Sequence, residues 1–140
     1  MSEGYAGDVS ATEAWEILEK DPEAVLIDVR SSPEWRYVGV PDVSPLGKRT
    51  VCVCWQSYPE MRLNGGFEQE LAAAGVQPEQ TLLLICRSGA RSRDAAIRLT
   101  AQGFRRCYNV AGGFEGPHDA ARHRGTRDGW KVAGLPWRQD

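Results

Sequence analysis

Two kinds of apolar spacing alternate along this chain, and together they predict its secondary structure. Apolar runs too short for a helix indicate buried strands, whereas apolar residues three and four positions apart indicate helices with one buried face. The runs predict strands over residues 24–30, 50–55, 82–85 and 106–110. Strands and helices follow one another in turn, which is typical of an α/β fold with a mainly parallel sheet.

Residues that cap helices mark where the helices begin and end. The predicted helices run from Ser10 through about Lys20, from Asn64 to Gly75 and over residues 91–102, with a short helical turn starting at Pro33. Ser10 and Glu13 have the spacing of a capping box. Proline suits the first position of a helix, and glycine commonly follows the last one, as Gly75 and Gly103 do here.

The length of 140 residues fits one domain with a core of its own. We expect that core over about residues 10–116. The periodic pattern fades after Gly116, but Trp130, Leu135 and Trp137 are too apolar to remain in solvent. We therefore expect the tail, residues 117–140, to pack back on the domain.

Charge and hydropathy exclude several classes of partner. The net charge is −2 and no basic stripe is present, which argues against nucleic acid as a partner. Residues 1–8 have neither the basic nor the apolar part of a secretion signal, and no apolar run is long enough to span a bilayer. We expect no membrane partner and a cytoplasmic location.

Four cysteines are present: Cys52, Cys54, Cys86 and Cys107. So few thiols do not make a disulfide framework, and all but Cys86 fall inside predicted buried strands, where cysteine packs as a small apolar residue. Cys52 and Cys54 share a strand face, so half of a metal site or a resolving pair for Cys86 is the alternative. No second ligand pair has suitable spacing, and His118 and His123 lie far away in a polar segment, so we expect no metal and no cofactor.

Cys86 stands where a buried strand ends and a helix is about to begin. The unpaired N–H groups of a helix N-terminus, its dipole and the guanidinium groups of Arg87 and Arg91 all favour an ionised sulfur. Gly89 permits positive φ, so the loop can turn its N–H groups inward around an anion. The simpler reading, in which Cys86 is an inert buried thiol, does not explain a glycine between two arginines.

Other polar residues fall at the carboxyl ends of neighbouring predicted strands. They are Asp28 with Arg30 and Trp55 with Gln56. Ligands of open α/β sheets bind outside the carboxyl ends of the strands. We expect these residues to converge with Cys86 on one pocket.

Five segments together resemble the rhodanese (sulfurtransferase) family over residues 10–116. They are residues 26–30 (LIDVR), 33–35 (PEW), 85–92 (ICRSGARS), 108–110 (YNV) and 112–114 (GGF). The resemblance implies a three-layer fold with a central sheet of about five strands flanked by helices. Many members carry Gly-His-Ile-Pro-Gly-Ala after the turn with the glutamate, where this chain has residues 38–43 (VGVPDV) and no histidine.

The resemblance also implies a reaction. Cys86 would take a sulfane sulfur from a small anionic donor such as thiosulfate, become a persulfide, and pass the sulfur to cyanide, a thiol or a sulfur-accepting protein. The loop that binds the donor would comprise Arg87, Ser88, Gly89, Ala90, Arg91 and Ser92. Asp28 and Arg30 would buttress this loop, while Trp35 and Phe114 would fill the core.

Two other functions remain to be weighed. A cysteine phosphatase or arsenate reductase needs five residues between cysteine and arginine, but position 92 is Ser92, and Arg91 leaves only four. A persulfide carrier or regulatory binding module would keep the fold without turnover. Activity with thiosulfate would separate such a module from a sulfurtransferase.

Overall fold

The computed structural model describes residues 4–57, 60, 62–117, 120–124 and 128–139. Its strands are β1 (Gly7–Val9), β2 (Val25–Asp28), β3 (Val40–Pro41), β4 (Val51–Cys52), β5 (Gln56–Ser57), β6 (Arg62–Leu63), β7 (Thr81–Ile85), β8 (Arg106–Val110) and β9 (Trp137–Arg138). Its helices are α1 (Ala11–Lys20), α2 (Ser32–Tyr37), α3 (Phe67–Ala73) and α4 (Ala90–Ala101), with a single 3₁₀ turn, η1 (Ser44–Leu46).

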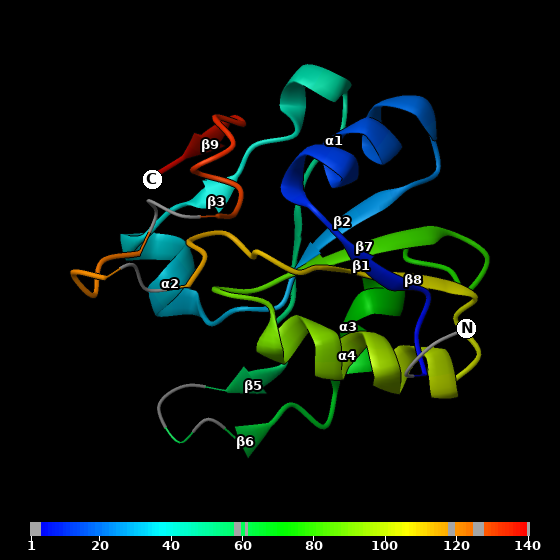
Figure 1. The fold of residues 1–140 in the computed structure, drawn as a ribbon. Helices are drawn as coiled ribbons and strands as arrows, with labels where there is room; N and C mark the ends of the chain where they lie inside the picture. Colours follow the sequence, from blue (N-terminus) through cyan, green and yellow to red (C-terminus); the bar gives the residue numbers. More distant parts are fainter. Residues whose placement is uncertain (1–3, 58–59, 61, 118–119, 125–127, 140) are drawn as a thin grey trace.

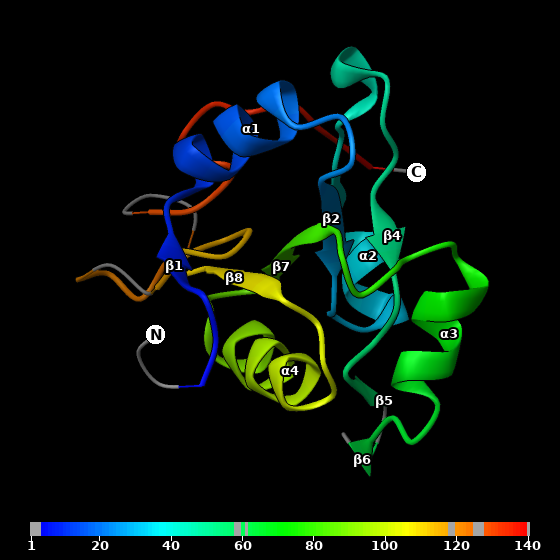
Figure 2. The same ribbon diagram turned by 90° about the vertical axis from the view of Figure 1, so that its right-hand side faces the viewer.

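Five parallel strands form the central sheet in the order β1-β8-β7-β2-β4. Helix α1 covers one face, and α3 and α4 cover the other (Figures 1 and 2). The predicted fold class, a mainly parallel sheet between helical layers, is therefore confirmed.

The central strand β7 shows why the apolar runs become parallel strands. Every residue of β7 is buried, because both faces of the sheet are covered. Leu82 and Leu84 belong to the apolar core that contains α3 and α4. Leu83 and Ile85 belong to the core that contains α1. The alternation leaves the chain after Ile85 at the carboxyl end of the middle strand.

The capping box of α1 forms as predicted. The side chain of Ser10 accepts the N–H of Glu13 at 3.1 Å, and the side chain of Glu13 accepts the N–H of Ser10 at 2.8 Å. Several boundaries differ from the prediction, among them the starts of α3 and α2. Gly66, not Asn64, is the N-cap of α3, because the Asn64 side chain accepts the N–H of Gly66 and shapes the turn before the helix. Pro33 is the second residue of α2 and not the first.

The prediction that three cysteines lie in buried strands is wrong for two of them. The predicted strand over residues 50–55 shortens to β4, which is the edge of the sheet and ends at Cys52. Cys52 is exposed and Cys54 is half-buried, because β4 is the outermost strand on this side of the five-stranded sheet. Cys107 is fully buried in β8, and burial raises the pKa of its thiol to about 11.

Residues near the C-terminus lie against the face that carries α1. Trp130 is fully buried, its indole N–H donates to the carbonyl of Pro136 at 2.7 Å, and its ring meets Trp15 edge-on. Strand β9 pairs antiparallel with β3, which sequence patterns did not reveal. No helix in the described part of the chain is both long and apolar enough to cross a membrane.

Candidate active site around Cys86

The sulfur of Cys86 lies at the junction between a strand and a helix. Cys86 directly follows β7, and α4 begins at Ala90 with Gly89 as its N-cap. Only 1% of the Cys86 surface is exposed. We call residues 86–92 the Cys86 loop.

Gly89 turns the loop toward the sulfur. Its φ of +106° lies in the left-handed region, and a Cβ at this position would overlap the carbonyl of Ala111. The N–H of Gly89 donates to the sulfur of Cys86 at 3.1 Å. Both the conformation and the close packing therefore require glycine.

The loop carbonyls are held away from the sulfur by the turn after β8. The N–H of Phe114 donates to the carbonyl of Cys86 at 2.8 Å, and those of Glu115 and Gly116 donate to the carbonyl of Arg87 at 3.0 and 3.1 Å. Since these carbonyls point at the turn, the N–H groups of the loop are left for an anion.

Helix α4 adds its positive end to the loop. Its first internal hydrogen bond runs from the N–H of Arg93 to the carbonyl of Gly89, so the N–H groups of residues 90–92 have no acceptor within the helix. The hydroxyl of Ser92 lies 3.2 Å from the sulfur of Cys86. Backbone N–H groups and a hydroxyl thus lie beside the sulfur, and N–H groups at the start of a helix suit an anion.

The structure separates the two loop arginines that the sequence placed together. Arg91 forms a two-point ion pair with Glu34 of α2, with N–O distances of 2.7 and 2.8 Å. Arg87 is exposed, and its guanidinium makes no hydrogen bond or ion pair with the residues that the structure describes. The positive charge of Arg91 is therefore largely balanced, whereas that of Arg87 is open to an incoming anion.

Glu34 is a site residue to which sequence reasoning gave no role. Burial opposes its ionisation, but the hydrogen bonds and the charge of Arg91, with bonds from Ser31, outweigh burial and lower the pKa of Glu34 from 4.5 to about 2. Its place in the PEW segment was the available signal. Glu34 ties α2 to the first turn of α4, and so to the Cys86 loop.

Asp28 and Arg30 form a fully buried ion pair next to the loop. The Arg30 guanidinium donates to both carboxylate oxygens of Asp28, the shortest distance being 2.7 Å, and to the carbonyl of Gly39 at 2.6 Å. It also lies over the ring of Phe114, 4.4 Å from the centroid. Because the N–H of Phe114 holds the carbonyl of Cys86, the pair supports the loop through Phe114.

The remaining candidates are structural. Trp55 is buried against Phe67 at a centroid distance of 5.1 Å, in the apolar core that also contains Cys86. Phe114 is fully buried, as predicted, and Trp35 is half-buried. His118 lies outside the described residues, and within those residues no group of three His, Cys, Asp or Glu side chains could hold a metal.

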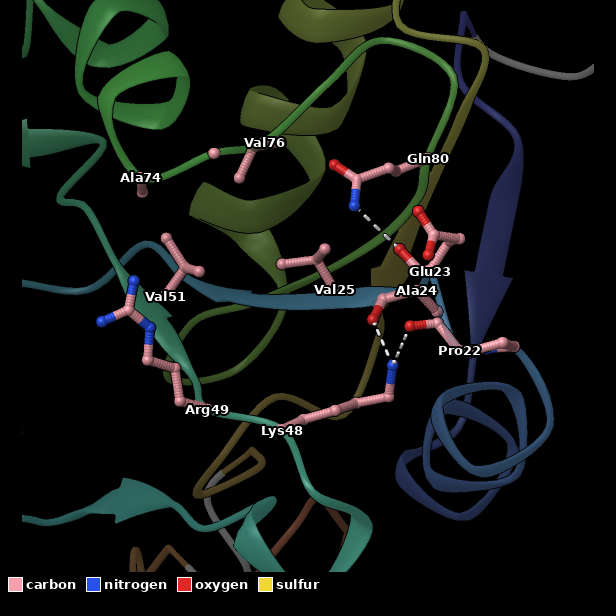
Figure 3. A pocket seen from close by; sticks show the side chains of 11 residues that line it. Pro22, Glu23, Ala24, Val25, Lys48, Arg49, Val51, Ala74, Val76 and Gln80 are labelled. Atoms are coloured by element: carbon pink, nitrogen blue, oxygen red, sulfur yellow. Dashed lines mark hydrogen bonds between the residues drawn. The ribbon is translucent and has the colours of Figure 1, made fainter.

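A shallow pocket of about 230 Å³ lies at the other end of the sheet (Figure 3). Val25 and Val51, the first residues of β2 and β4, line it, so it opens at the amino ends of these strands. The ammonium of Lys48 donates to the carbonyls of Asp21, Pro22 and Ala24. Lys48 thus fastens the turn before β2 and is not available to a ligand.

Comparisons with known proteins agree with this geometry. Thiosulfate sulfurtransferase GlpE of Actinobacillus pleuropneumoniae is 32% identical over 136 residues, which cover 97% of this chain and 95% of that protein. The rhodanese-like domain-containing protein 4 of Arabidopsis thaliana chloroplasts is 30% identical over 129 residues, 91% of this chain and 25% of that protein. A family model described as the STR4 middle domain matches residues 6–140. This chain belongs to the rhodanese-like sulfurtransferase family.

A solved structure extends the agreement to the fold. The crystal structure of Rv0390 from M. tuberculosis is 47% identical in sequence and superposes with a TM-score of 0.88, covering 97% of this chain and 99% of that one. The fold of this chain therefore matches that of the solved structure over nearly its whole length.

The Glu34–Arg91 pair makes a testable contribution to stability. The carboxylate of Glu34 contributes stability that is complete above its unfolded pKa of 4.5 and is lost as the pH falls through about 2. We expect Glu34→Gln to lower the free energy of unfolding by about 2 kcal/mol at pH 7 and by about half of that at pH 3, as measured by urea denaturation.

Glu68→Gln is the matched control, because Glu68 pairs with Arg98 at the surface, where half of the arginine is exposed. This substitution is expected to cost under ~1 kcal/mol at both pH values. Equal losses for the two variants at pH 7 would show that the Glu34–Arg91 pair does not hold the loop.

Proposed function

We propose that this protein is a sulfurtransferase that carries a sulfane sulfur on Cys86. The observation that carries the proposal is the position of the sulfur, buried at the start of α4 and 3.1 Å from the inward N–H of Gly89. A sulfur in this position is nucleophilic as a thiolate, and the same N–H groups serve a persulfide. The relative named a thiosulfate sulfurtransferase supports the same reaction.

The reaction has two steps. The Cys86 thiolate attacks the outer sulfur of thiosulfate, the S–S bond of the donor breaks, and sulfite leaves with the electron pair. The sulfur then forms a persulfide on Cys86, and cyanide or a thiolate attacks its terminal atom, taking that sulfur and restoring the cysteine thiolate. Two-electron displacement at sulfur suffices for both steps, so the proposal names no metal and no cofactor.

Each residue of the Cys86 loop has a role in this scheme. The N–H groups of residues 87–92 stabilise the anionic sulfur, and Gly89 sets their direction. Arg87 draws in the anionic donor, because its charge is open, and offsets charge on the departing sulfite. Arg91 acts mainly through Glu34 to fix the start of α4.

The acceptor is a small thiol, cyanide or a sulfur-accepting protein. Among the described residues of the loop, Arg87 is the cation without an ion pair, and one such charge near a nearly buried sulfur suits a small anionic donor. A transferred phosphoryl group needs an arginine that faces its oxygens. By its position in the sequence, Arg91 is the arginine that comes nearest to binding a phosphoryl group. Its guanidinium is instead paired with the carboxylate of Glu34. Sulfur transfer is therefore better supported than phosphatase or arsenate reductase activity.

Cys86→Ser tests the central residue. A hydroxyl is a poor sulfur acceptor, so thiocyanate production from thiosulfate and cyanide is expected to fall at least 1,000-fold, on the order of the loss when a nucleophile is removed. Cys52→Ser is the control, because Cys52 is the exposed cysteine at the sheet edge. It is expected to keep its rate. A folded C86S protein with activity near that of the parent would exclude Cys86 as the sulfur carrier.

Arg87→Ala tests how the donor is recruited. Loss of the open charge is expected to raise KM for thiosulfate about tenfold with a smaller change in kcat, and to weaken the dependence of kcat/KM on salt. Arg105→Ala removes an exposed charge just before β8, at the opposite end of the strands, and is expected to change neither parameter. Equal kinetics for the two variants would show that Arg87 does not recruit the donor.

A further inference from the structure

A chain of hydrogen bonds runs from the sulfur of Cys86 to the surface. The hydroxyl of Ser92 lies 3.2 Å from the sulfur and 2.5 Å from the side-chain oxygen of Asn109. The amide nitrogen of Asn109 donates to the carboxylate of Asp8 at 3.1 Å. Asp8 and Asn109 are register partners on β1 and β8, so the sheet itself aligns this last link.

The chain connects a buried end with an exposed one. Ser92 is fully buried and Asn109 is 2% exposed, whereas Asp8 is exposed at the edge of the sheet. In a buried network of hydrogen bonds, the interaction of each group with its neighbour depends strongly on which of the two donates the proton. The proton directions therefore decide what the chain does to the sulfur.

The carboxylate of Asp8 fixes those directions. A carboxylate only accepts hydrogen bonds, so the NH₂ group of Asn109 faces Asp8 and its oxygen faces Ser92. The hydroxyl proton of Ser92 then points at Asn109, and its lone pairs face Cys86. Ser92 is placed to donate to the sulfur of Cys86 as well as to Asn109, but it has only one proton. With that proton on the side of Asn109, Ser92 has none for a Cys86 thiolate and can only accept from a neutral thiol.

Tyr5 is a second hydrogen-bond donor to Asp8. The Tyr5 hydroxyl donates to the Asp8 carboxylate at 2.7 Å. This bond, together with burial of the ring, raises the pKa of Tyr5, so Tyr5 stays protonated. The Asp8 carboxylate thus accepts two hydrogen bonds, one from Tyr5 and one from Asn109.

We propose that Asp8 and Asn109 are positioning residues that direct the hydroxyl proton of Ser92 away from Cys86 while the thiol is neutral. The proton turns to the sulfur only when the sulfur becomes charged. Turning the proton to a thiolate or persulfide leaves the oxygen of Asn109 without its donor, and that loss opposes ionisation. The outer end of the chain therefore sets how readily Cys86 becomes reactive. The inference concerns the regulation of the site and rests on the proposed function for its importance.

Other charged groups lie on the elements around the Cys86 loop and the hydrogen bonds behind it, and Arg91 among them interacts electrostatically with Cys86. They are Arg87 in the loop, Arg91 on α4 with Glu34 on α2, the Asp28–Arg30 pair after β2, and Arg93 beside Tyr5. Two of these cations are balanced by carboxylates in ion pairs. A test of the chain must therefore separate its hydrogen bonds from the simple loss of a charge.

The rate at which iodoacetamide alkylates Cys86, followed against pH on the peptide that holds it, provides that test. Asn109→Leu removes the acceptor and frees the Ser92 proton for the sulfur, and Asp8→Ala lets the Asn109 amide reverse with the same result. Both variants are expected to move the midpoint of the profile about one pH unit lower, the size of a hydrogen bond to a charged group. Asp8 itself is exposed, and circular dichroism of each variant checks that the fold is kept after Tyr5 and Asn109 lose this acceptor.

A Ser92→Ala background separates the effect of the hydrogen bonds from the effect of losing the Asp8 charge. In that background Asn109→Leu is expected to leave the midpoint unchanged. Asp8→Ala is expected to shift the midpoint only as far as Asp94→Ala does. Asp94→Ala is the charge control, because it removes an exposed carboxylate of α4 that takes no part in these hydrogen bonds. Equal shifts of Asp8→Ala with and without Ser92 would overturn the proposal. Because alkylation requires no sulfur transfer, such a result would leave the proposed reaction untouched.

Discussion

The backbone of the Cys86 loop has to turn its N–H groups inward, and most of the surrounding structure serves this requirement. Hydrogen bonds from residues 114–116 pull two loop carbonyls outward. Gly89 packs so close to Ala111 that a side chain at this position would overlap the Ala111 carbonyl. Both restraints come from the segment after β8, so the site depends on β7 and β8 being neighbours in the sheet.

The charges around the sulfur follow from the same requirement. Asp28 balances Arg30, and Glu34 balances Arg91, so backbone dipoles supply much of the field at the sulfur itself. A thiolate and a persulfide each carry one negative charge, so a fixed set of N–H groups suits both states of the proposed cycle. In the proposed reaction, the charge of Arg87, which pairs with none of the residues that the structure describes, acts on the donor and on the departing sulfite.

The buried Asp28–Arg30 pair is costly in free energy for the folded protein. Burying two charges is expensive, and a buried pair seldom adds stability over apolar packing of the same volume. Here the guanidinium also holds the carbonyl of Gly39 and the ring of Phe114, which an apolar side chain does not do. The pair is therefore better explained by the position it gives to the loop than by stability.

Local patterns predicted the features that depend on neighbouring residues. The α1 capping box, strands β7 and β8 and the junction at Cys86 all follow from residues a few positions apart. Tertiary contacts decided the rest. Arg91 and Glu34 are 57 positions apart, and nothing in the spacing of either indicates the other. Cys52 is exposed because β4 lies at an edge, which an apolar run does not reveal.

The short pairings were also beyond sequence patterns. Strands β1 and β9 have three and two residues, too few for a periodic signal, and they form only because β8 and β3 offer partners. The link from Asn109 to Asp8 depends on the register of β1 and was hidden for the same reason. Asn109 lies in the YNV segment of the family resemblance, which was the one available signal.

Intact-protein mass spectrometry after treatment with thiosulfate tests the central claim most directly. The account predicts a gain of one sulfur atom per chain, located on the peptide that contains Cys86 and removed by cyanide with formation of thiocyanate. Chains without the added mass, or with the added sulfur on Cys52 and none on Cys86, would contradict the claim that this loop holds a persulfide.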